Sequence, residues 1–206
     1  MDQKVARPAD RYADRYPHLG TGPVPLAINR SAAQFENERD LVFRPAWHLV
    51  GRVEEIPNAG DYFVQDIPTL STSLIICRGD DQQIRAFHNM CRHRGNKVVP
   101  TGKLRGNAFG FSCAFHGWTY DRAGCLAVVP DEEEFFSFSK EQYGLTQVAC
   151  DVWEGFVFVN LLGEHAPELS SAVAEFQDQF QGYFKDLSLF AHFGADVRCN
   201  WKIILD

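Results

Sequence analysis

"NMCRHRGNKVV" (89–99) and "FSCAFHGWTYDRAGCL" (111–126) each place a cysteine two or three residues before a histidine, with a glycine close behind. The first segment reads Cys91-x-His93 and the second reads Cys113-x-x-His116. Any one of these residues alone is better explained as a buried cysteine or a hydrogen-bonded core histidine. Four of them in two short pairs predict instead a site in which two thiolates and two imidazoles hold a metal.

The sequence around the two pairs, from Trp47 to Leu162, predicts short β-strands. Apolar stretches of about six residues are separated by turn residues such as those at 58–60 and 79–81. The predicted strand segments are WHLVGRV (47–53), DYFVQDI (61–67), SLIICRG (73–79), IRAFHNM (84–90), FGFSCAF (109–115), GWTYD (117–121) and VWEGFVFVNL (152–161). We expect a mainly β domain over residues 41–162, a small antiparallel sandwich or barrel with the Cys/His pairs on loops.

The flanking segments show other patterns. Residues 1–40 predict an extended arm followed by a short helix, roughly Ala32 to Arg39, which begins with a capping box of Ser31 and Gln34. Residues 163–206 predict a helix and then an extended strand over about 188–199. The helix prediction rests on apolar residues spaced three or four positions apart, namely Leu169, Val173, Phe176, Phe180 and Phe184.

Composition excludes several classes of partner. The 206 residues carry a net charge of −7 and no run of lysine or arginine, which argues against binding to nucleic acid. We find no signal peptide and no stretch of eighteen uncharged apolar residues, so we expect a cytoplasmic protein without membrane contact. In that reducing compartment, six cysteines favour metal ligation or burial over disulfides.

Two kinds of metal site accept two cysteines and two histidines. Zinc does so, but zinc fingers usually group cysteine with cysteine and histidine with histidine along the chain. In one class of [2Fe–2S] cluster, one iron takes both cysteines and the other takes both histidines, so each loop contributes one ligand to each iron. The alternating order of the pairs favours this cluster, and a structural zinc domain stays as an alternative.

The residues around the pairs resemble the Rieske domain of ring-hydroxylating oxygenase α-subunits. The resemblance rests on Cys91-Arg92-His93-Arg94-Gly95, on Cys113 to Tyr120, and on the following Gly124-Cys125-Leu126. It extends to Asn200-Trp201-Lys202, which is similar to the tripeptide that opens the oxygenase catalytic domain. It implies a Rieske-type [2Fe–2S] cluster ligated by Cys91, His93, Cys113 and His116, with the cysteines on the inner iron and the histidines on the outer iron.

The residues near the four ligands also predict features around the cluster. Backbone amides near Gly95 and Gly117 are expected to donate to the sulfurs. Trp118 and Tyr120 are interpreted either as a cover over the cluster or as ordinary strand aromatics.

The family's mononuclear iron ligands are not found in this sequence. In the oxygenases, two closely spaced histidines and a carboxylate bind a non-haem Fe(II). We therefore interpret the sequence as the N-terminal part of a longer α-subunit, with 163–206 as the incomplete start of an α+β catalytic domain. We assign no catalytic residue, expect Fe(II) only in the full-length protein, and expect this chain alone to be inactive.

The implied function is electron entry for an aromatic ring-hydroxylating oxygenase. Electrons would come from a ferredoxin or a flavin-dependent reductase and pass to Fe(II) for O₂-dependent hydroxylation. The resemblance implies a homotrimer of α-subunits, with or without a β-subunit. A stand-alone Rieske electron carrier is the alternative, although a carrier needs neither the helix predicted after 163 nor Asn200-Trp201-Lys202.

Overall fold

The computed structural model describes residues 14, 16–18, 22, 23 and 25–205. The chain divides into two compact units, Glu36–Val197 and a smaller unit of Met1–Phe35 with Arg198–Asp206. The domain boundaries predicted after residues 40 and 162 stay predictions.

The described part of the smaller unit contains short helices. They are α2 (Ala27–Arg30), the start of α3 (Ala32–Glu38) and α6 (Trp201–Leu205). The backbone N–H of Gln34 donates to Ser31 Oγ over 3.2 Å, which is the first half of the predicted capping box. The helix predicted from Ala32 is therefore confirmed. Most of the arm predicted before it lies outside the described residues.

The larger unit begins with the end of α3, continues with η1 (Arg39–Phe43), one turn of π-helix, and contains two antiparallel sheets. The seven-stranded sheet has the order β1-β10-β9-β4-β3-β2-β5. Its strands are β1 (His48–Arg52), β2 (Asp61–Ile67), β3 (Thr72–Arg78), β4 (Ile84–His88), β5 (Arg105–Asn107), β9 (Gln147–Trp153) and β10 (Phe156–Asn160). The other sheet has three short strands, β6 (Phe111–Ser112), β7 (Thr119–Tyr120) and β8 (Leu126–Val128). Mainly antiparallel β-structure was predicted, and it is confirmed.

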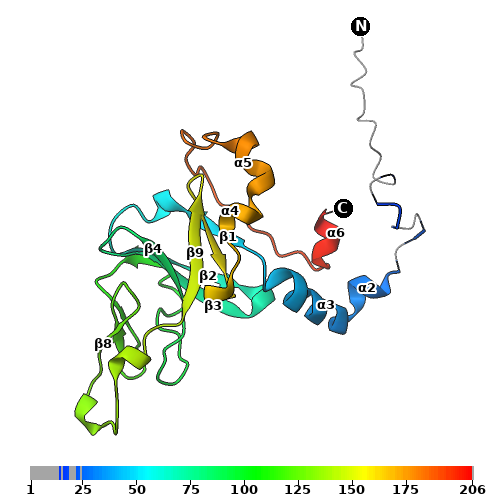
Figure 1. Ribbon diagram of the computed structural model, residues 1–206. Coiled ribbons are helices and arrows are strands. Elements are labelled where there is room, and N and C mark those ends of the chain that lie inside the picture. The colour runs from blue at the N-terminus through cyan, green and yellow to red at the C-terminus, as the bar shows by residue number, and fades with distance from the viewer. Residues whose placement is uncertain (1–13, 15, 19–21, 24, 206) are drawn as a thin grey trace. The chain divides into compact units, whose positions relative to one another are not determined.

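The larger unit also contains 3₁₀ turns and two helices. In Figure 1 the three-stranded sheet, marked by β8, lies at the lower end of this unit, while α4 (Leu169–Ala172) and α5 (Ala174–Phe180) lie at its upper end. The 3₁₀ turns are η2 (Val53–Glu55), η3 (Pro68–Leu70), η4 (Glu132–Glu134), η5 (Lys140–Gln142) and η6 (Gly163–His165).

Strand β3 is buried on both of its faces from Leu74 to Cys77, which explains its unbroken apolar run. Alternate side chains of a strand point to opposite faces. Leu74 and Ile76 therefore enter one core, with residues of β9 and β10, whereas Ile75 and Cys77 enter a second core. That second core includes residues from both loops with the Cys/His pairs and from the three-stranded sheet.

The strand prediction was wrong in two respects. The segment 152–161 is not one strand but the end of β9, a two-residue turn and β10, with Trp153 paired to Phe156. Glu154 and Gly155 in the turn both have positive φ, as a tight hairpin whose twist matches its strands requires. The three-residue strands β5 and β8 were not predicted.

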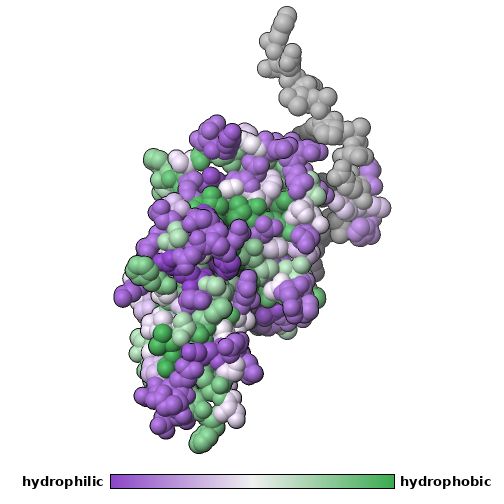
Figure 2. All heavy atoms as spheres, turned by 60° about the vertical axis from the view of Figure 1, so that its left-hand side comes forward, coloured by the Kyte–Doolittle hydropathy of each residue, from purple (hydrophilic) through white to green (hydrophobic). Residues whose placement is uncertain are grey.

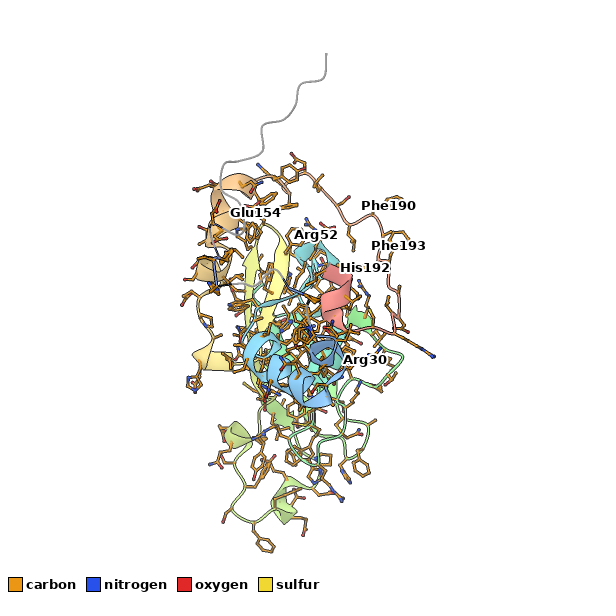
Figure 3. All side chains as sticks on the ribbon, turned by 90° about the vertical axis from the view of Figure 1, so that its right-hand side faces the viewer. Arg30, Arg52, Glu154, Phe190, His192 and Phe193 are labelled. Carbon is orange, nitrogen blue, oxygen red and sulfur yellow. The ribbon has the colours of Figure 1, made fainter. Side chains whose placement is uncertain are left out.

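The C-terminal part of the larger unit also differs from the prediction. The predicted helix is interrupted at Val173 between α4 and α5. No strand forms over 188–199, because a strand needs hydrogen-bonding partners along its backbone and this segment pairs with no strand among the described residues. Figure 3 shows Phe190 and Phe193 on the outer side of this segment, where they are 98% and 93% exposed.

Within the described ranges, no helix has the length and apolar character needed to cross a membrane.

Candidate metal centre

The two Cys/His loops have the same backbone hydrogen bonds. In the first, Cys91 N–H donates to Asn96 O over 2.8 Å, and Gly95 N–H donates to Cys91 O over 2.9 Å. In the second, Cys113 N–H donates to Trp118 O and Gly117 N–H donates to Cys113 O, both over 2.9 Å. Each cysteine therefore starts a tight turn that closes on itself four and five residues later.

A glycine is needed at the same point of both turns. Gly95 has φ of +74° and Gly117 has φ of +72°, in the left-handed region that other residues rarely adopt. A Cβ on Gly117 would also lie 3.0 Å from Pro130 Cγ, whereas a Cβ on Gly95 would meet nothing within 4 Å.

The cysteines and the histidines lie at different depths. Cys91 and Cys113 are 3% and 2% exposed within the second core, whereas His93 is half-buried and His116 is exposed. The two imidazole rings lie side by side, with centroids 4.6 Å apart. The four predicted residues are thus brought together as an inner pair of sulfurs and an outer pair of rings.

Trp118 lies against the histidine pair. Its indole stacks on the His93 ring at 4.8 Å with 12° between the planes, and Phe135, Phe138 and Tyr143 surround the indole. Trp118 is only 3% exposed. Its interpretation as a cover beside the site is therefore supported by direct contact with His93.

Tyr120 contacts the site through its hydroxyl group. The Tyr120 oxygen lies 3.2 Å from Cys91 Sγ and accepts the backbone N–H of Arg92 over 2.9 Å. Because the Arg92 amide supplies its own hydrogen, the phenol hydrogen is left to donate to the sulfur. Burial, together with the nearby sulfur of Cys91, raises the pKa of Tyr120 and keeps the phenol protonated as a donor.

Hydrogen bonds favour the thiolate form of Cys113. Burial opposes ionisation, but the backbone N–H groups of Phe115 and His116 and the side chains of Asn96 and Cys91 outweigh it, so the pKa of the Cys113 thiol is lowered. The amides that donate to this sulfur belong to Phe115 and His116, the two residues before Gly117. Those of Gly95 and Gly117 donate to the cysteine carbonyls.

Electrostatics favour the neutral form of His93. Burial, followed by the neighbouring His116 and Arg94, lowers the pKa of His93. Neutral imidazole is the form that ligates metals. In the described part of the chain, His93 Nδ1 is also buried without any hydrogen-bond partner, which is costly unless something else occupies that position.

These features fit a dinuclear cluster better than a single ion. No three His, Cys, Asp or Glu side chains among the described residues surround one metal position. The donors are arranged as a sulfur pair and an imidazole pair, as in a [2Fe–2S] cluster with two cysteines on one iron and two histidines on the other. His93 Nδ1, which has no hydrogen-bond partner among the described residues, is a nitrogen ligand of the kind that such a cluster needs.

The surface beside the histidines mixes apolar and charged groups. Phe115 is 56% exposed, and the Arg94 guanidinium lies 5.7 Å from the centre of its ring. At the lower end of Figure 2, around the segment after β8, hydrophobic surface is interleaved with hydrophilic surface.

One contact of the site was not predicted. Asn96 Nδ2 lies 3.8 Å from Cys113 Sγ and joins the two loops. Its spacing from Cys91 resembles no ligand motif, so only the folded structure reveals it.

Comparisons with known proteins agree with this geometry. Residues 46–146 match the family model described as the Rieske [2Fe-2S] domain. The chain is 30% identical over 185 residues to the carnitine monooxygenase oxygenase subunit of Acinetobacter pittii, covering 88% of this chain and 48% of the relative. It is 30% identical over 203 residues to the anthranilate 1,2-dioxygenase large subunit of Burkholderia cepacia, covering 93% and 46%.

Solved structures show the same relationship. The quaternary ammonium Rieske monooxygenase CntA in complex with gamma-butyrobetaine superposes with a TM-score of 0.80 at 30% identity, covering 88% of this chain and 51% of that one. Naphthalene 1,2-dioxygenase from Rhodococcus sp. bound to indole gives 0.68 at 31% identity, covering 75% and 34%. The chain spans about half the length of the curated relatives described above.

Proposed function

Residues 46–146 are a Rieske [2Fe-2S] domain related to those of Rieske oxygenase α-subunits, and on this premise we propose that the chain is the electron-accepting part of such an oxygenase. The observation that carries the proposal is the pairing of two buried cysteine sulfurs with two histidine rings at the outer edge of the same core. A Rieske cluster, when bound, accepts and releases one electron at a time.

The proposed ligands are the four residues of the two loops. Cys91 and Cys113 would hold the inner iron, and His93 and His116 would hold the outer iron. The low exposure of both sulfurs and the lowered pKa values of Cys113 and His93 support this assignment, as does His93 Nδ1, which finds no hydrogen-bond partner among the described residues.

The surrounding residues would favour reduction. Two thiolates and two neutral imidazoles around two ferric ions and two sulfides sum formally to zero charge, so an added electron meets less repulsion than it would with four thiolates. The Tyr120 hydroxyl and the amides at Cys113 offset negative charge on the sulfurs, and Trp118 keeps water from one side of His93. The exposed His116 would offer the electron an exit to solvent or to a partner.

The proposed donor of electrons is a ferredoxin or a flavin-dependent reductase, and the proposed acceptor is the O₂-activating Fe(II) of an oxygenase α-subunit assembly. The relatives include both carnitine monooxygenase and aromatic dioxygenase subunits, so the predicted aromatic substrate stays a proposal. Trimeric assembly stays a proposal as well.

Two cysteine substitutions in the same core test the ligand assignment. Cys77 is as buried as Cys113, but its thiol donates to Arg122 O over 3.6 Å. We expect Cys113→Ser to abolish the visible absorption of the reconstituted chain, and Cys77→Ser to retain it with one electron taken up per chain on dithionite titration.

The reverse pattern, with Cys77→Ser bleached and Cys113→Ser coloured, would show that the ligand set is wrong. A wild-type chain that binds zinc and no iron or sulfide would favour the alternative interpretation as a structural zinc domain.

A further inference from the structure

Two side chains cross between the loops and reach the cysteine sulfur of the opposite loop. Tyr120, which follows the second loop on β7, lies 3.2 Å from Cys91 Sγ in the first. Asn96, in the first loop, places its amide nitrogen 3.8 Å from Cys113 Sγ in the second. Each sulfur therefore has a side-chain donor that comes from the other loop.

The orientation of the Asn96 amide follows from its neighbours. Its nitrogen also lies 3.1 Å from Lys97 O, so the group faces one carbonyl oxygen and one sulfur. Both are acceptors, and the amide nitrogen carries two hydrogens, one for each. Turning the amide over would set its oxygen against both acceptors. The donor assignment therefore satisfies both acceptors.

The backbone of Asn96 holds this side chain in place. Asn96 O accepts the N–H of Cys91 over 2.8 Å, the bond that closes the first loop. One residue therefore contacts both cysteines, Cys91 through its carbonyl group and Cys113 through its amide. An increase in the separation of the loops would lengthen the N–H···S contact.

We propose that Asn96 is a positioning and tuning residue that raises the reduction potential of the bound cluster by donating an N–H to Cys113 Sγ, an inference that rests on the ligand set proposed above. Reduction adds one negative charge, part of which resides on the sulfurs. A hydrogen bond to a sulfur is therefore stronger in the reduced state than in the oxidised state, and the potential rises.

Three variants separate hydrogen bonding from structural effects. Asn96→Leu keeps the approximate size of the side chain and removes the donor. Asn96→Asp replaces the donor with a carboxylate that repels the added electron. Asn107→Leu is the matched control, because Asn107 is an exposed asparagine on β5 whose amide binds Ala59 O and Asp61 Oδ1.

The measurement is the midpoint potential of each cluster-loaded 206-residue chain, followed by visible absorption or circular dichroism during a redox titration. We expect Asn96→Leu to lower the equilibrium constant for reduction roughly tenfold, or about 59 mV for one electron. Asn96→Asp should lie lower still, and Asn107→Leu should match the wild type. If the role of Asn96 were purely structural, the midpoint potentials would not fall in the order wild type, Asn96→Leu, Asn96→Asp.

Other outcomes test the inference and the ligand set separately. Loaded Asn96 variants with the wild-type potential would overturn the inference and leave the ligand set standing, whereas a wild-type chain that binds no [2Fe–2S] cluster would overturn both. If Asn96→Leu fails to load, Asn96→Ser takes its place as the neutral variant with a short donor. A potential for Asn96→Asp below that of Asn96→Ser supports the inference, and equal potentials contradict it.

Discussion

Gly95 and Gly117 occupy equivalent positions in the two metal-site loops: each donates its backbone N–H over 2.9 Å to the carbonyl of the cysteine four residues before it, with φ of +74° and +72°. The side chains on the loops differ, since the histidine lies two residues after Cys91 but three residues after Cys113. The shared backbone turn aims both sulfurs into one core, and the different spacing brings the two imidazole rings together.

Alanine at these two glycines should have unequal effects. Gly95→Ala adds the cost of a left-handed alanine, about 1 kcal/mol of unfolding free energy. Gly117→Ala adds the same strain and a contact of its Cβ with Pro130 Cγ at 3.0 Å, so we expect a further loss of roughly 1–3 kcal/mol. Urea unfolding measures both, with Gly194→Ala as a control that has neither positive φ nor a close neighbour. Equal losses of unfolding free energy at the two sites would show that the contact of a Gly117 Cβ with Pro130 adds no cost.

The cysteines outside the site should differ in reactivity. Burial raises the pKa of Cys77 and of Cys150 to about 12, whereas Cys125 and Cys199 are exposed. A raised pKa leaves little thiolate at pH 8, and the thiolate is the form that alkylates. Iodoacetamide followed by mass spectrometry should therefore label Cys125 and Cys199 first. Labelling of the partly exposed Cys150 should still accelerate between pH 9 and 10. Labelling of Cys150 as fast as Cys125 at pH 8 would argue against the raised pKa.

Glu55 should make stability depend on acid pH. Its side chain is 5% exposed and contacts Arg105 Nη2 at 2.7 Å, the Arg52 N–H at 2.7 Å and His192 Nε2 at 3.4 Å. Burial opposes its ionisation, but the Arg52 N–H and Arg105 outweigh burial and lower the pKa of Glu55. A carboxyl whose pKa is lower in the folded state stabilises the fold above its unfolded pKa of about 4.3. This contribution is lost as the pH falls through the folded pKa.

The comparison is the free energy of unfolding of wild type and Glu55→Gln from pH 7 to pH 3. We expect the wild type to be more stable by on the order of 1 kcal/mol at neutral pH, because hydrogen bonds to a charged group are lost in the variant. The difference should shrink in acid. A difference that stays constant or grows as the pH falls would show that the carboxylate is not stabilised by these contacts.

The exposed aromatic segment should drive self-association of the 206-residue chain. Phe190 and Phe193 are almost fully exposed, on a segment held to η2 by the bond from Leu189 N–H to Glu54 Oε1 at 2.5 Å. Large exposed apolar groups favour association. Phe190→Ser with Phe193→Ser should lower the apparent mass in concentrated solution by light scattering and leave the cluster absorption unchanged. An unchanged apparent mass would show that other surfaces cause any association.

Sequence and structure agree where the signal is local. The runs that became β1 to β4 carry enough apolar and β-branched residues to be recognised, and Ser31 with Gln34 marks the start of α3 correctly. The proposed ligands could be predicted because their spacing is itself the motif.

The rest depends on contacts between distant residues. The three-residue strands β5 and β8 are defined by their neighbours, since Arg-Gly-Asn at 105–107 has no strand character of its own. The apolar residues at 189–197 suggested a strand, but a strand requires a partner. The contact from Asn96 to Cys113 joins two loops and has no trace in residue spacing.

The ligand set is tested most directly by pulsed EPR of the one-electron-reduced chain prepared with ¹⁵N-labelled histidine. The account predicts a low average g value, as expected for mixed cysteine and histidine ligation, and couplings to two histidine nitrogens. Replacing His93 or His116 should remove one coupling or the whole cluster, whereas replacing the half-buried His88 should leave both couplings. A reduced cluster without histidine couplings, or a colourless and EPR-silent protein, would contradict the account.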